Sequence, residues 1–453
     1  MSVVENSNHQ DKSFWLSNYG MYVPNRPLYS SLKADVTIIG GGFTGLNSAI
    51  EFKKDNPNAT VVVIESELIG FGASGRNAGF STKLFGLEPA LVKLRWGKEK
   101  VLEAHRYLTK AVKYTQNLIA DNKLDCSYED TALVRVSYSK SQLNRMYDDY
   151  ELFDQLGISD DLTLIDKDYL SERFLTDRFI GGVYENCIGL IDPCKQVREL
   201  KRLAESLGIH VYENTPALHI DNSQAKISVL TPNGELKTEK LVLATNGYTH
   251  KVPSLRKVRN KQSPLWTYQV VTERLTKKQW DSIGWANREA FGDNRQLLHY
   301  FRPTPDGRII MGGGDALTYN SSSMNFDTSL SSWEHCEAHL KWIYPQLKNV
   351  KVYQKWGGPV SVNMDLVPEI GFISDERIIY SGGCFGHGVA LSHLNGKTIA
   401  DLLSEKKTML SNFWIVNRTA LPMPGQFISF LGGQVARKGL KAWDRWEERE
   451  LSK

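Results

Sequence analysis

Cysteine, long apolar runs and a strong charge of either sign are all scarce in this sequence. It has five cysteines in 453 residues and no CxxC pair, so neither a disulfide framework nor a zinc site is indicated. No run approaches the roughly 18 apolar residues of a membrane span, and the N-terminal MSVVENSNHQDK lacks the apolar core of a secretory signal. The formal net charge of +4 is too small to suggest nucleic-acid binding. We therefore expect a cytoplasmic protein with reduced thiols, and we turn to its motifs for function.

A glycine-rich turn near the N-terminus separates two short apolar runs. Residues 36–39 and 60–64 are rich in β-branched side chains, as buried strands are. Residues 44–54 have the period of a helix, and the second run ends on Glu65. The turn carries a G-x-G-x-x-G pattern at Gly40, Gly42 and Gly45. This order of strand, glycines, helix, strand and acid predicts a dinucleotide-binding unit.

Each part of this unit has a physical role in holding a dinucleotide. The first glycine permits the tight turn, the second lets the backbone approach a pyrophosphate, and the third lets the helix pack on the sheet. Phe43 and Thr44 open the helix, whose free N–H groups and partial positive charge attract phosphates. Glu65 is placed to accept hydrogen bonds from a ribose diol. The pattern alone leaves open whether the dinucleotide is NAD or FAD.

The second run is followed at once by GFGASGRNAGF, residues 70–80, in which four of eleven residues are glycine. Ligands of open α/β sheets bind at the carboxyl ends of the strands, so we expect this segment to lie against the cofactor. Its small residues would let the backbone approach a flat ring, and the arginine and asparagine would donate hydrogen bonds. The predicted cofactor contacts are Ser74, Gly75, Arg76, Asn77, Ala78 and Gly79.

This segment resembles the GASGRNxG signature of the FAD-dependent oxidoreductases of the D-amino-acid oxidase superfamily. An SFWL segment at residues 13–16 points to the γ-glutamylputrescine oxidase-like branch. Three further segments extend the resemblance over most of the chain: residues 189–249, 356–371 and 381–403. The resemblance implies that FAD is the cofactor and that the protein is an enzyme.

The resemblance also implies cofactor contacts far from the first motif. Ala217 lies in the stretch that passes the adenine in the family, and ATNGY contributes Thr245, Asn246 and Gly247. Gly358 belongs to the segment that holds a tethering cysteine in sarcosine oxidase-type relatives. Because residues 356–365 contain no cysteine, we expect non-covalent FAD. The end of a helix near the flavin would be formed by Gly386, His387, Gly388 and Val389.

The expected fold class is α/β, with a discontinuous Rossmann-type FAD-binding domain and a substrate domain of antiparallel β-sheet plus helices. Residues 33–86, 166–249 and 354–405 would form the FAD-binding domain. Residues 87–165 and 250–353 would form the substrate domain. Residues 1–32 would be an N-terminal extension and residues 406–453 a C-terminal tail.

The expected reaction is oxidation of the C–N bond of a small amine or amino acid, a secondary or anionic amine. The resemblance implies hydride transfer to flavin N5, hydrolysis of the imine, and reoxidation by oxygen with release of H2O2. The alternative is a dehydrogenase that passes electrons to a quinone or carrier protein. No metal is expected, and the sequence does not identify the amine.

Candidate substrate-site residues come from the second insertion and from the helix end near the flavin. Tyr300 and Arg302 share one strand face, and Arg302 would clamp a carboxylate or phosphonate, or else form a structural contact. Trp266 and Tyr268 would form an aromatic wall or pack in the core. His387 would donate near the flavin or be a loop histidine. His299 is a further lining candidate, and Lys261 would promote oxygen attack or be a surface lysine.

The tail, from residue 412 onward, mixes aromatic, apolar and basic residues. One interpretation is a basic amphipathic helix in peripheral contact with a membrane surface. The interpretation that we favour is a helix docked on the protein's own body.

Overall fold

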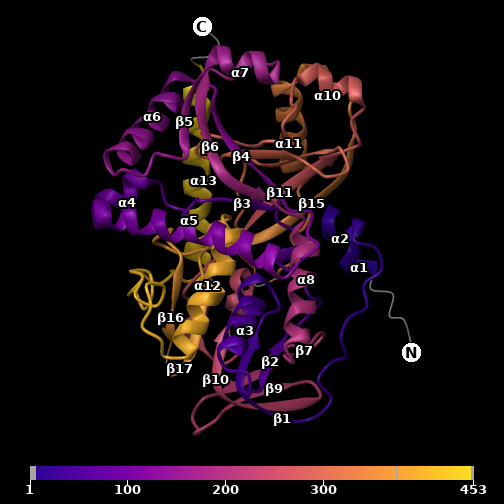
Figure 1. Ribbon diagram of the computed structural model, residues 1–453, viewed down its shortest axis with the longest axis vertical. Helices are drawn as coiled ribbons and strands as arrows, with labels where there is room; N and C mark the ends of the chain where they lie inside the picture. The colour runs from indigo at the N-terminus through magenta and orange to yellow at the C-terminus, as the bar shows by residue number, and fades with distance from the viewer. Residues whose placement is uncertain (1–6, 322, 374, 450–453) are drawn as a thin grey trace.

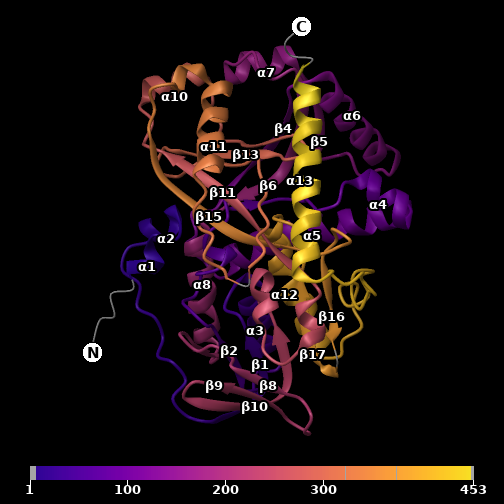
Figure 2. The same ribbon diagram turned by 180° about the vertical axis from the view of Figure 1, so that it is seen from behind.

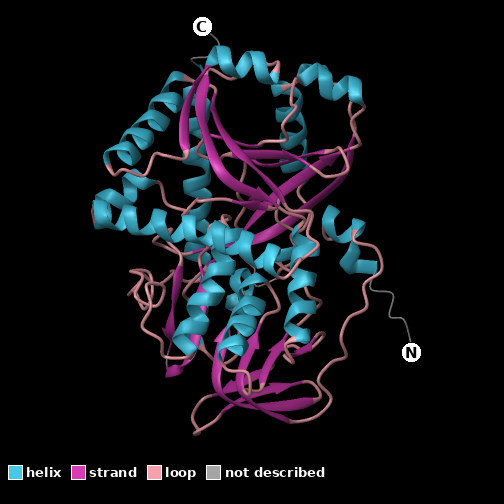
Figure 3. Cartoon of the chain, in the orientation of Figure 1, coloured by secondary structure: helices cyan, strands magenta, loops and turns pink. Residues whose placement is uncertain are grey.

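Two β-sheets organise the computed structural model, which describes residues 7–321, 323–373 and 375–449. Figure 1 shows one sheet in the lower half of the molecule and the other in the upper half, with helices around both. Figure 3 shows that the helices lie mostly outside the strands. Among the described residues, no helix combines the length and the hydropathy of a membrane span.

The first sheet has a parallel centre of the Rossmann type. Its strand order is β16-β17-β10-β1-β2-β7, and β8 and β9 extend it beside β10. Strand β1 lies between β10 and β2 and is parallel to both. The strands are β1 (Leu32–Ile39), β2 (Val61–Ile64), β7 (His210–Tyr212), β8 (His219–Asp221), β9 (Ile227–Thr231), β10 (Gly234–Leu243), β16 (Glu369–Ile373) and β17 (Asp375–Gly382).

Two helices from distant parts of the chain pack closely on this sheet. Helix α3 (Phe43–Asp55) follows β1, and helix α12 (Gly388–Leu403) follows β17. A Cβ at Gly396 would lie 2.4 Å from the Cβ of Asn47, so only glycine permits this approach. His393 of α12 lies 4.7 Å from the Phe43 ring in the same interface. The N-termini of both helices are thereby brought to one edge of the sheet.

Helix α8 (Pro193–Ser206) shows how the sequence sets a helix start. Asp192 is the N-cap, and its carboxylate accepts the N–H groups of Cys194 and Lys195 at 3.0 Å each. Proline occupies the first helical position, where no N–H is needed. The helix packs on α3 and closes the same layer of the first sheet.

The second sheet roofs the first and is mostly antiparallel. Its order is β15-β11-β14-β13-β12-β4-β6-β3, with β5 paired to β6, and only the β12–β4 pair is parallel within the described residues. Helix α11 (Leu330–Ile343) covers one face. The strands are β3 (Phe80–Ser81), β4 (Glu129–Ser137), β5 (Leu162–Asp166), β6 (Gly181–Leu190), β11 (Ser263–Thr272), β12 (Ala290–Asp293), β13 (His299–Pro303), β14 (Ile309–Gly313) and β15 (Val352–Val362).

The remaining helices lie at the periphery or connect the sheets. They are α1 (Ser7–Gln10), α2 (Phe14–Asn18), η1 (Ala73–Gly75), α4 (Pro89–Trp96), α5 (Lys98–Asp121), α6 (Lys140–Gln155), α7 (Lys167–Phe174), η2 (Asn246–Lys251), α9 (Arg256–Arg259), α10 (Lys277–Ile283), η3 (Pro345–Leu347) and α13 (Gln426–Glu448).

The predicted fold class is confirmed: a parallel α/β sheet stands beside a largely antiparallel sheet with helices. The domain boundaries stay a prediction. Strand β6 and most of strand β15 fall within the predicted FAD-binding segments but pair in the second sheet. Apolar runs indicate strands but carry no information about their pairing partners.

The buried His393 predicts how stability depends on pH. Burial lowers the pKa of His393 to about 4 from 6.5, so between these values the unfolded chain binds a proton that the folded chain does not. Stability therefore falls as the pH drops from about 6.5 toward 4. This one histidine lowers the free energy of unfolding by about 2 kcal/mol at pH 5 relative to pH 7.

In wild type the free energy of unfolding should fall between pH 7 and pH 5. We expect this fall to be smaller by about 2 kcal/mol in His393→Gln, measured by urea unfolding with saturating FAD. The control is His210→Gln, because His210 is exposed. An unchanged pH dependence in His393→Gln, or an equal change in the control, would contradict this assignment.

Candidate functional site

The turn between β1 and α3 has no room for side chains. Gly40 has φ +111°, and a Cβ there would lie 2.6 Å from the carbonyl oxygen of Ala244. A Cβ at Gly45 would lie 2.0 Å from the carbonyl oxygen of Gly40. Strand, turn and helix are therefore pressed together in the way that the glycine pattern predicts.

The N-terminus of α3 is met by the glycine-rich segment. The hydroxyl of Ser74 accepts the N–H of Phe43 at 3.0 Å. A Cβ at Gly42 would lie 2.8 Å from that hydroxyl oxygen. Helix geometry leaves the next N–H groups, of Thr44 and Gly45, without partners inside the helix. They remain suited to phosphate oxygens.

Glu65 stands at the end of β2, beside this turn. Its carboxylate accepts the N–H groups of Gly41 at 2.8 Å and Glu67 at 3.0 Å. Burial raises the pKa of Glu65, and these hydrogen bonds oppose the rise. The carboxylate also accepts the Ser66 hydroxyl at 3.2 Å. A carboxylate has about four lone-pair sites, so this one retains a site that can accept a ligand hydroxyl.

The side chains of Arg76 and Asn77 donate hydrogen bonds to protein atoms, and their predicted cofactor contacts stay predictions. Arg76 donates from Nε to Phe71 O at 2.6 Å and from Nη1 to Asp327 at 2.6 Å. Asn77 donates to Ala73 O at 3.0 Å. These side chains shape the segment and tie it to the second sheet.

The glycines and alanine of this segment are explained by close backbone contacts. A Cβ at Gly75 would lie 2.1 Å from Gly70 O, and one at Gly79, where φ is +79°, 2.1 Å from Ile191 O. Ala78 is buried in the cluster that contains Trp15. Any cofactor contacts of Gly75, Ala78 and Gly79 stay predictions.

The loops that follow β10 and β17 are joined by a hydrogen-bond network. Ser361 of β15 donates to the side chain of Asn246 and accepts Gly383 N at 2.9 Å. Gln262 donates to Asn246 O at 2.9 Å and accepts Gly383 N at 2.8 Å. Neither residue is among the predicted contacts. Ser361 lies in the resemblance segment 356–371, but no pattern singles it out, and Gln262 belongs to no recognisable motif.

The other predicted cofactor residues from these loops gather at the same edge. Thr245 lies within hydrogen-bond distance of Thr249, at 2.8 Å. A Cβ at Gly247 would lie 3.3 Å from the Cβ of Pro359, and one at Gly358 would lie 3.3 Å from that of Arg76. Ala217, from the connection between β7 and β8, is partly buried and packs against the core cluster that contains Val62 and Ile64 of β2.

His387 caps the N-terminus of α12 at this edge. Its N–H donates to Cys384 O at 3.0 Å. Within the described residues, its Nδ1 is buried without a hydrogen-bond partner. Burial lowers its pKa to about 4, so the imidazole is neutral at neutral pH. Gly386, with φ +85°, makes the turn, and Gly388 and Val389 begin the helix.

These features fit a flavin dinucleotide. The glycines leave backbone exposed where a pyrophosphate would approach, and Glu65 offers acceptors to a ribose. Two helix N-termini reach the same edge, as the parallel strand order requires. Among the described residues, His387 Nδ1 and the buried Tyr248 hydroxyl have no hydrogen-bond partner, and a ligand would satisfy both.

Tyr300 and Arg302 of β13 face the glycine-rich segment. The ring of Tyr300 packs edge-on against Phe80, with centroids 5.7 Å apart. Arg302 donates from Nη1 to Ala78 O at 3.2 Å and to Ile191 O at 2.8 Å. The two residues share a face, as predicted from their spacing.

Arg302 is fully buried and is held mainly by backbone carbonyls. Its exposed fraction is 0%, and Nε and Nη1 donate to backbone carbonyls. Within the described residues, its Nη2 is buried without a hydrogen-bond partner. Burial lowers its pKa to about 10. The contacts of Nη1 with the carbonyls of Ala78 and Gly79 support a structural role for Arg302. A substrate clamp through Nη2 stays a prediction.

Trp266 and Tyr268 lie on the opposite face of β11. Gln269 follows Tyr268 in the strand, so its side chain points to the other face. It donates to Arg76 O at 3.0 Å, which identifies that face as the one turned toward the first sheet. Tyr268 instead donates to Phe326 O at 2.9 Å and packs near Trp333 of α11. Both aromatic residues belong to one buried cluster. Both side chains are thus packed in the core, and the aromatic wall stays a prediction.

His299 also points to the helix-covered face. Its Nδ1 lies 3.0 Å from Asp293, and His339 joins them in a buried group. Arg295 Nη1 lies 3.1 Å from His299 Nδ1 and 3.0 Å from His339 Nδ1. A guanidinium in contact with both rings supplies the positive charge there and disfavours a metal ion.

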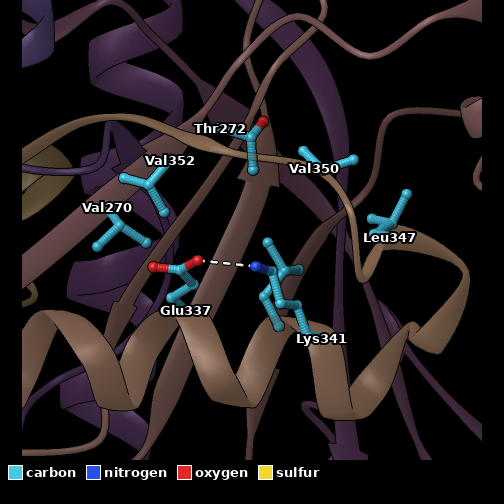
Figure 4. A pocket seen from close by; sticks show the side chains of 8 residues that line it. Val270, Thr272, Glu337, Lys341, Leu347, Val350 and Val352 are labelled. Atoms are coloured by element: carbon cyan, nitrogen blue, oxygen red, sulfur yellow. Dashed lines mark hydrogen bonds and ion pairs between the residues drawn. The ribbon is translucent and has the colours of Figure 1, made fainter.

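A small pocket opens on the same helix-covered face (Figure 4). It lies between α11 and strands β11 and β15, and its lining is mainly aliphatic. A Glu337–Lys341 ion pair at 2.7 Å crosses it. None of the predicted site residues lines this pocket.

Comparisons with known proteins agree with this geometry. The DAO family profile, described as FAD dependent oxidoreductase, matches residues 35–402. The gamma-glutamylputrescine oxidoreductase of Escherichia coli (strain K12) is 28% identical over 415 residues, 91% of this chain and 93% of that protein.

Solved structures show the same fold. Glycine oxidase from Geobacillus kaustophilus has a TM-score of 0.71 at 18% identity, covering 86% of this chain and 100% of that chain. L-proline dehydrogenase from P. horikoshii has a TM-score of 0.72 at 22% identity, covering 85% and 97%.

The position of Glu65 predicts a measurable effect on dinucleotide affinity. If Glu65 accepts the ribose hydroxyls as predicted, Glu65→Gln removes the charge from those hydrogen bonds, each worth about 1.5–3 kcal/mol when charged and less when neutral. We expect the Kd for FAD to rise about 10- to 100-fold, measured by quenching of flavin fluorescence. The control is Glu67→Gln, because Glu67 is exposed two residues away. An equal affinity in Glu65→Gln and wild type would contradict the assignment.

Proposed function

The chain belongs to the DAO family of FAD-dependent oxidoreductases, and from that premise we propose that it transfers electrons from a small amine or amino acid to molecular oxygen. It is an FAD-dependent enzyme that oxidises amines or amino acids. The observation that carries the proposal is the convergence of the β1–α3 turn, Glu65 and the N-terminus of α12 beneath a second sheet. This arrangement supports a cofactor bound at the sheet edge and a substrate between cofactor and roof.

The residues that would hold FAD divide by the part of the cofactor they meet. Gly42, Thr44 and Gly45 would meet the pyrophosphate, and Glu65 the ribose. His387 and the first turn of α12 would meet the flavin. Bound FAD supplies a two-electron acceptor for the hydride that leaves the carbon next to nitrogen.

The side chains of the site are suited to an amine that arrives unprotonated. His387 is neutral at neutral pH because burial lowers its pKa to about 4. Burial raises the pKa of Tyr300, so its hydroxyl also stays neutral. Neither group is a strong base, and the enzyme's contribution is to orient the C–H bond and to exclude water.

We also propose that FAD is held without a covalent bond. Residues 356–365 contain no cysteine. Cys384 is the nearest thiol to the loop network, and its Sγ lies 3.8 Å from Asn246 Oδ1 and 4.0 Å from Ser361 Oγ. Those contacts place its sulfur within the loop network.

An amine panel tests the proposed reaction. We expect at least one secondary or anionic amine to bleach the flavin absorbance without oxygen, and the same amine to yield equimolar H2O2 in air. N-methyl amino acids, polyamine conjugates and aminophosphonates form the panel. Bleaching that air does not reverse, while a quinone or carrier protein reverses it, would instead establish a dehydrogenase. No bleaching by any amine would refute amine oxidation.

The burial of Arg302 predicts an effect that does not depend on substrate charge. We expect Arg302→Gln to loosen residues 78–79 and to lower kcat/KM about tenfold, equally for anionic and neutral amines, since one buried charged hydrogen bond is worth about 1.5–3 kcal/mol. Arg274→Gln is the control, because Arg274 is exposed and paired with Asp306. A rise in KM confined to anionic amines would instead restore Arg302 as a substrate clamp.

A further inference from the structure

Helix α13 is docked on the second sheet through its charged side chains. Its two buried residues are both acids, Asp444 and Glu447. Asp444 accepts two backbone N–H groups of the β12–β13 connection at 2.8 and 3.1 Å. Arg437 forms a bidentate pair with Asp315, with both distances 2.6 Å. The tail is therefore docked on the protein body, as expected, but its polar face is the one turned inward.

Further ion pairs fix the same face. Lys441 lies 2.6 Å from Asp315, and Arg295 lies 2.7 Å from Glu448. Glu447 pairs with Arg145 at the C-terminal end. These contacts hold the helix in one rotational setting, so its opposite face is fixed toward solvent. Figure 2 shows α13 lengthwise across the face of the molecule turned to the viewer.

The outward face of α13 is apolar. Ile428, Leu431, Val435 and Trp446 are spaced by three, four and eleven residues, which places them on one stripe of a helix. Their exposed fractions are 62%, 46%, 72% and 60%. In the described part of the chain, no side chain of α13 belongs to a buried hydrophobic cluster. A contiguous exposed stripe of this kind marks an interaction surface.

The charged residues on the exposed part of α13 are all basic. Lys438, Arg445 and Arg449 are exposed, whereas the acids of the helix are buried or paired. The chain entering the helix lies beside more positive charge, since Met423 N donates to Asn260 O at 2.7 Å. Asn260 directly follows α9, where Lys257 and Arg259 are exposed.

We propose that this outward face of α13 binds an anionic membrane surface and lies in its plane. Aliphatic side chains would enter the interfacial layer, tryptophans suit that depth, and the basic residues would meet anionic headgroups. A second copy is the less suitable occupant, because pairing two such faces would bring basic residues together without acids between them. The docking does not depend on which acceptor reoxidises the flavin.

This docking has a consequence for the site. Asp315, which holds α13, follows β14, and the β12–β13 connection leads into the strand that carries Tyr300. A membrane bound by α13 would therefore lie next to the sheet that roofs the site. Helix α13 itself is about 34 Å long, and it lacks the hydropathy to cross the bilayer.

Vesicle flotation with the full-length holoenzyme tests the proposal. We expect binding to vesicles of phosphatidylglycerol and phosphatidylcholine, little binding to phosphatidylcholine alone, and weaker binding at high salt. The double variant Leu431→Asp/Val435→Asp and the double variant Lys438→Glu/Arg445→Glu should each lower the affinity for these vesicles at least about tenfold. Flavin absorbance reports that each variant is folded.

The matched control is Leu94→Asp, since Leu94 is 79% exposed on helix α4. It should bind the anionic vesicles as wild type does. Absence of flotation at low salt, or undiminished flotation of Leu431→Asp/Val435→Asp, would overturn the proposal. A different result would also overturn it: a wild-type protein that is an oligomer in sedimentation velocity and does not bind vesicles, while the double variant is a monomer. The occupant of the face would then be a second copy.

Discussion

The close approach of backbone to backbone at the carboxyl edge of the first sheet is the constraint on which the rest of the site depends. The β1–α3 turn, the loop after β10 and the glycine-rich segment meet at distances that leave no space for a Cβ. This packing brings the free N–H groups of α3 to the edge and puts Glu65 beside them. It also explains why small residues recur in segments that lie far apart in the sequence.

Arginines then hold the second sheet over this edge. Arg76 reaches Asp327, which also pairs with Lys12 of the N-terminal segment. Arg302 reaches back from β13 to the carbonyls of the glycine-rich segment. Both guanidinium groups are buried, and hydrogen bonds to a carboxylate or to carbonyls offset the cost of that burial. The relative position of the two sheets is therefore set by polar contacts that tolerate little displacement.

The sequence predicts the local part of this site well and the long-range part poorly. Gly40, Gly42, Gly45 and Glu65 are identified because their spacing within one strand–helix–strand unit fixes their roles. Arg76 is found, but its partner is not, because Asp327 is 251 residues away. Alternation shows that Trp266 and Tyr268 share a face, yet it does not tell which face a helix covers. The inward polar face of α13 is likewise set by partners on other strands.

The visible absorption spectrum of the purified protein, before and after acid precipitation, tests the central claim most directly. The account predicts a yellow protein whose flavin bands move entirely into the acid supernatant as FAD. A protein that is colourless and stays so after incubation with FAD would contradict it.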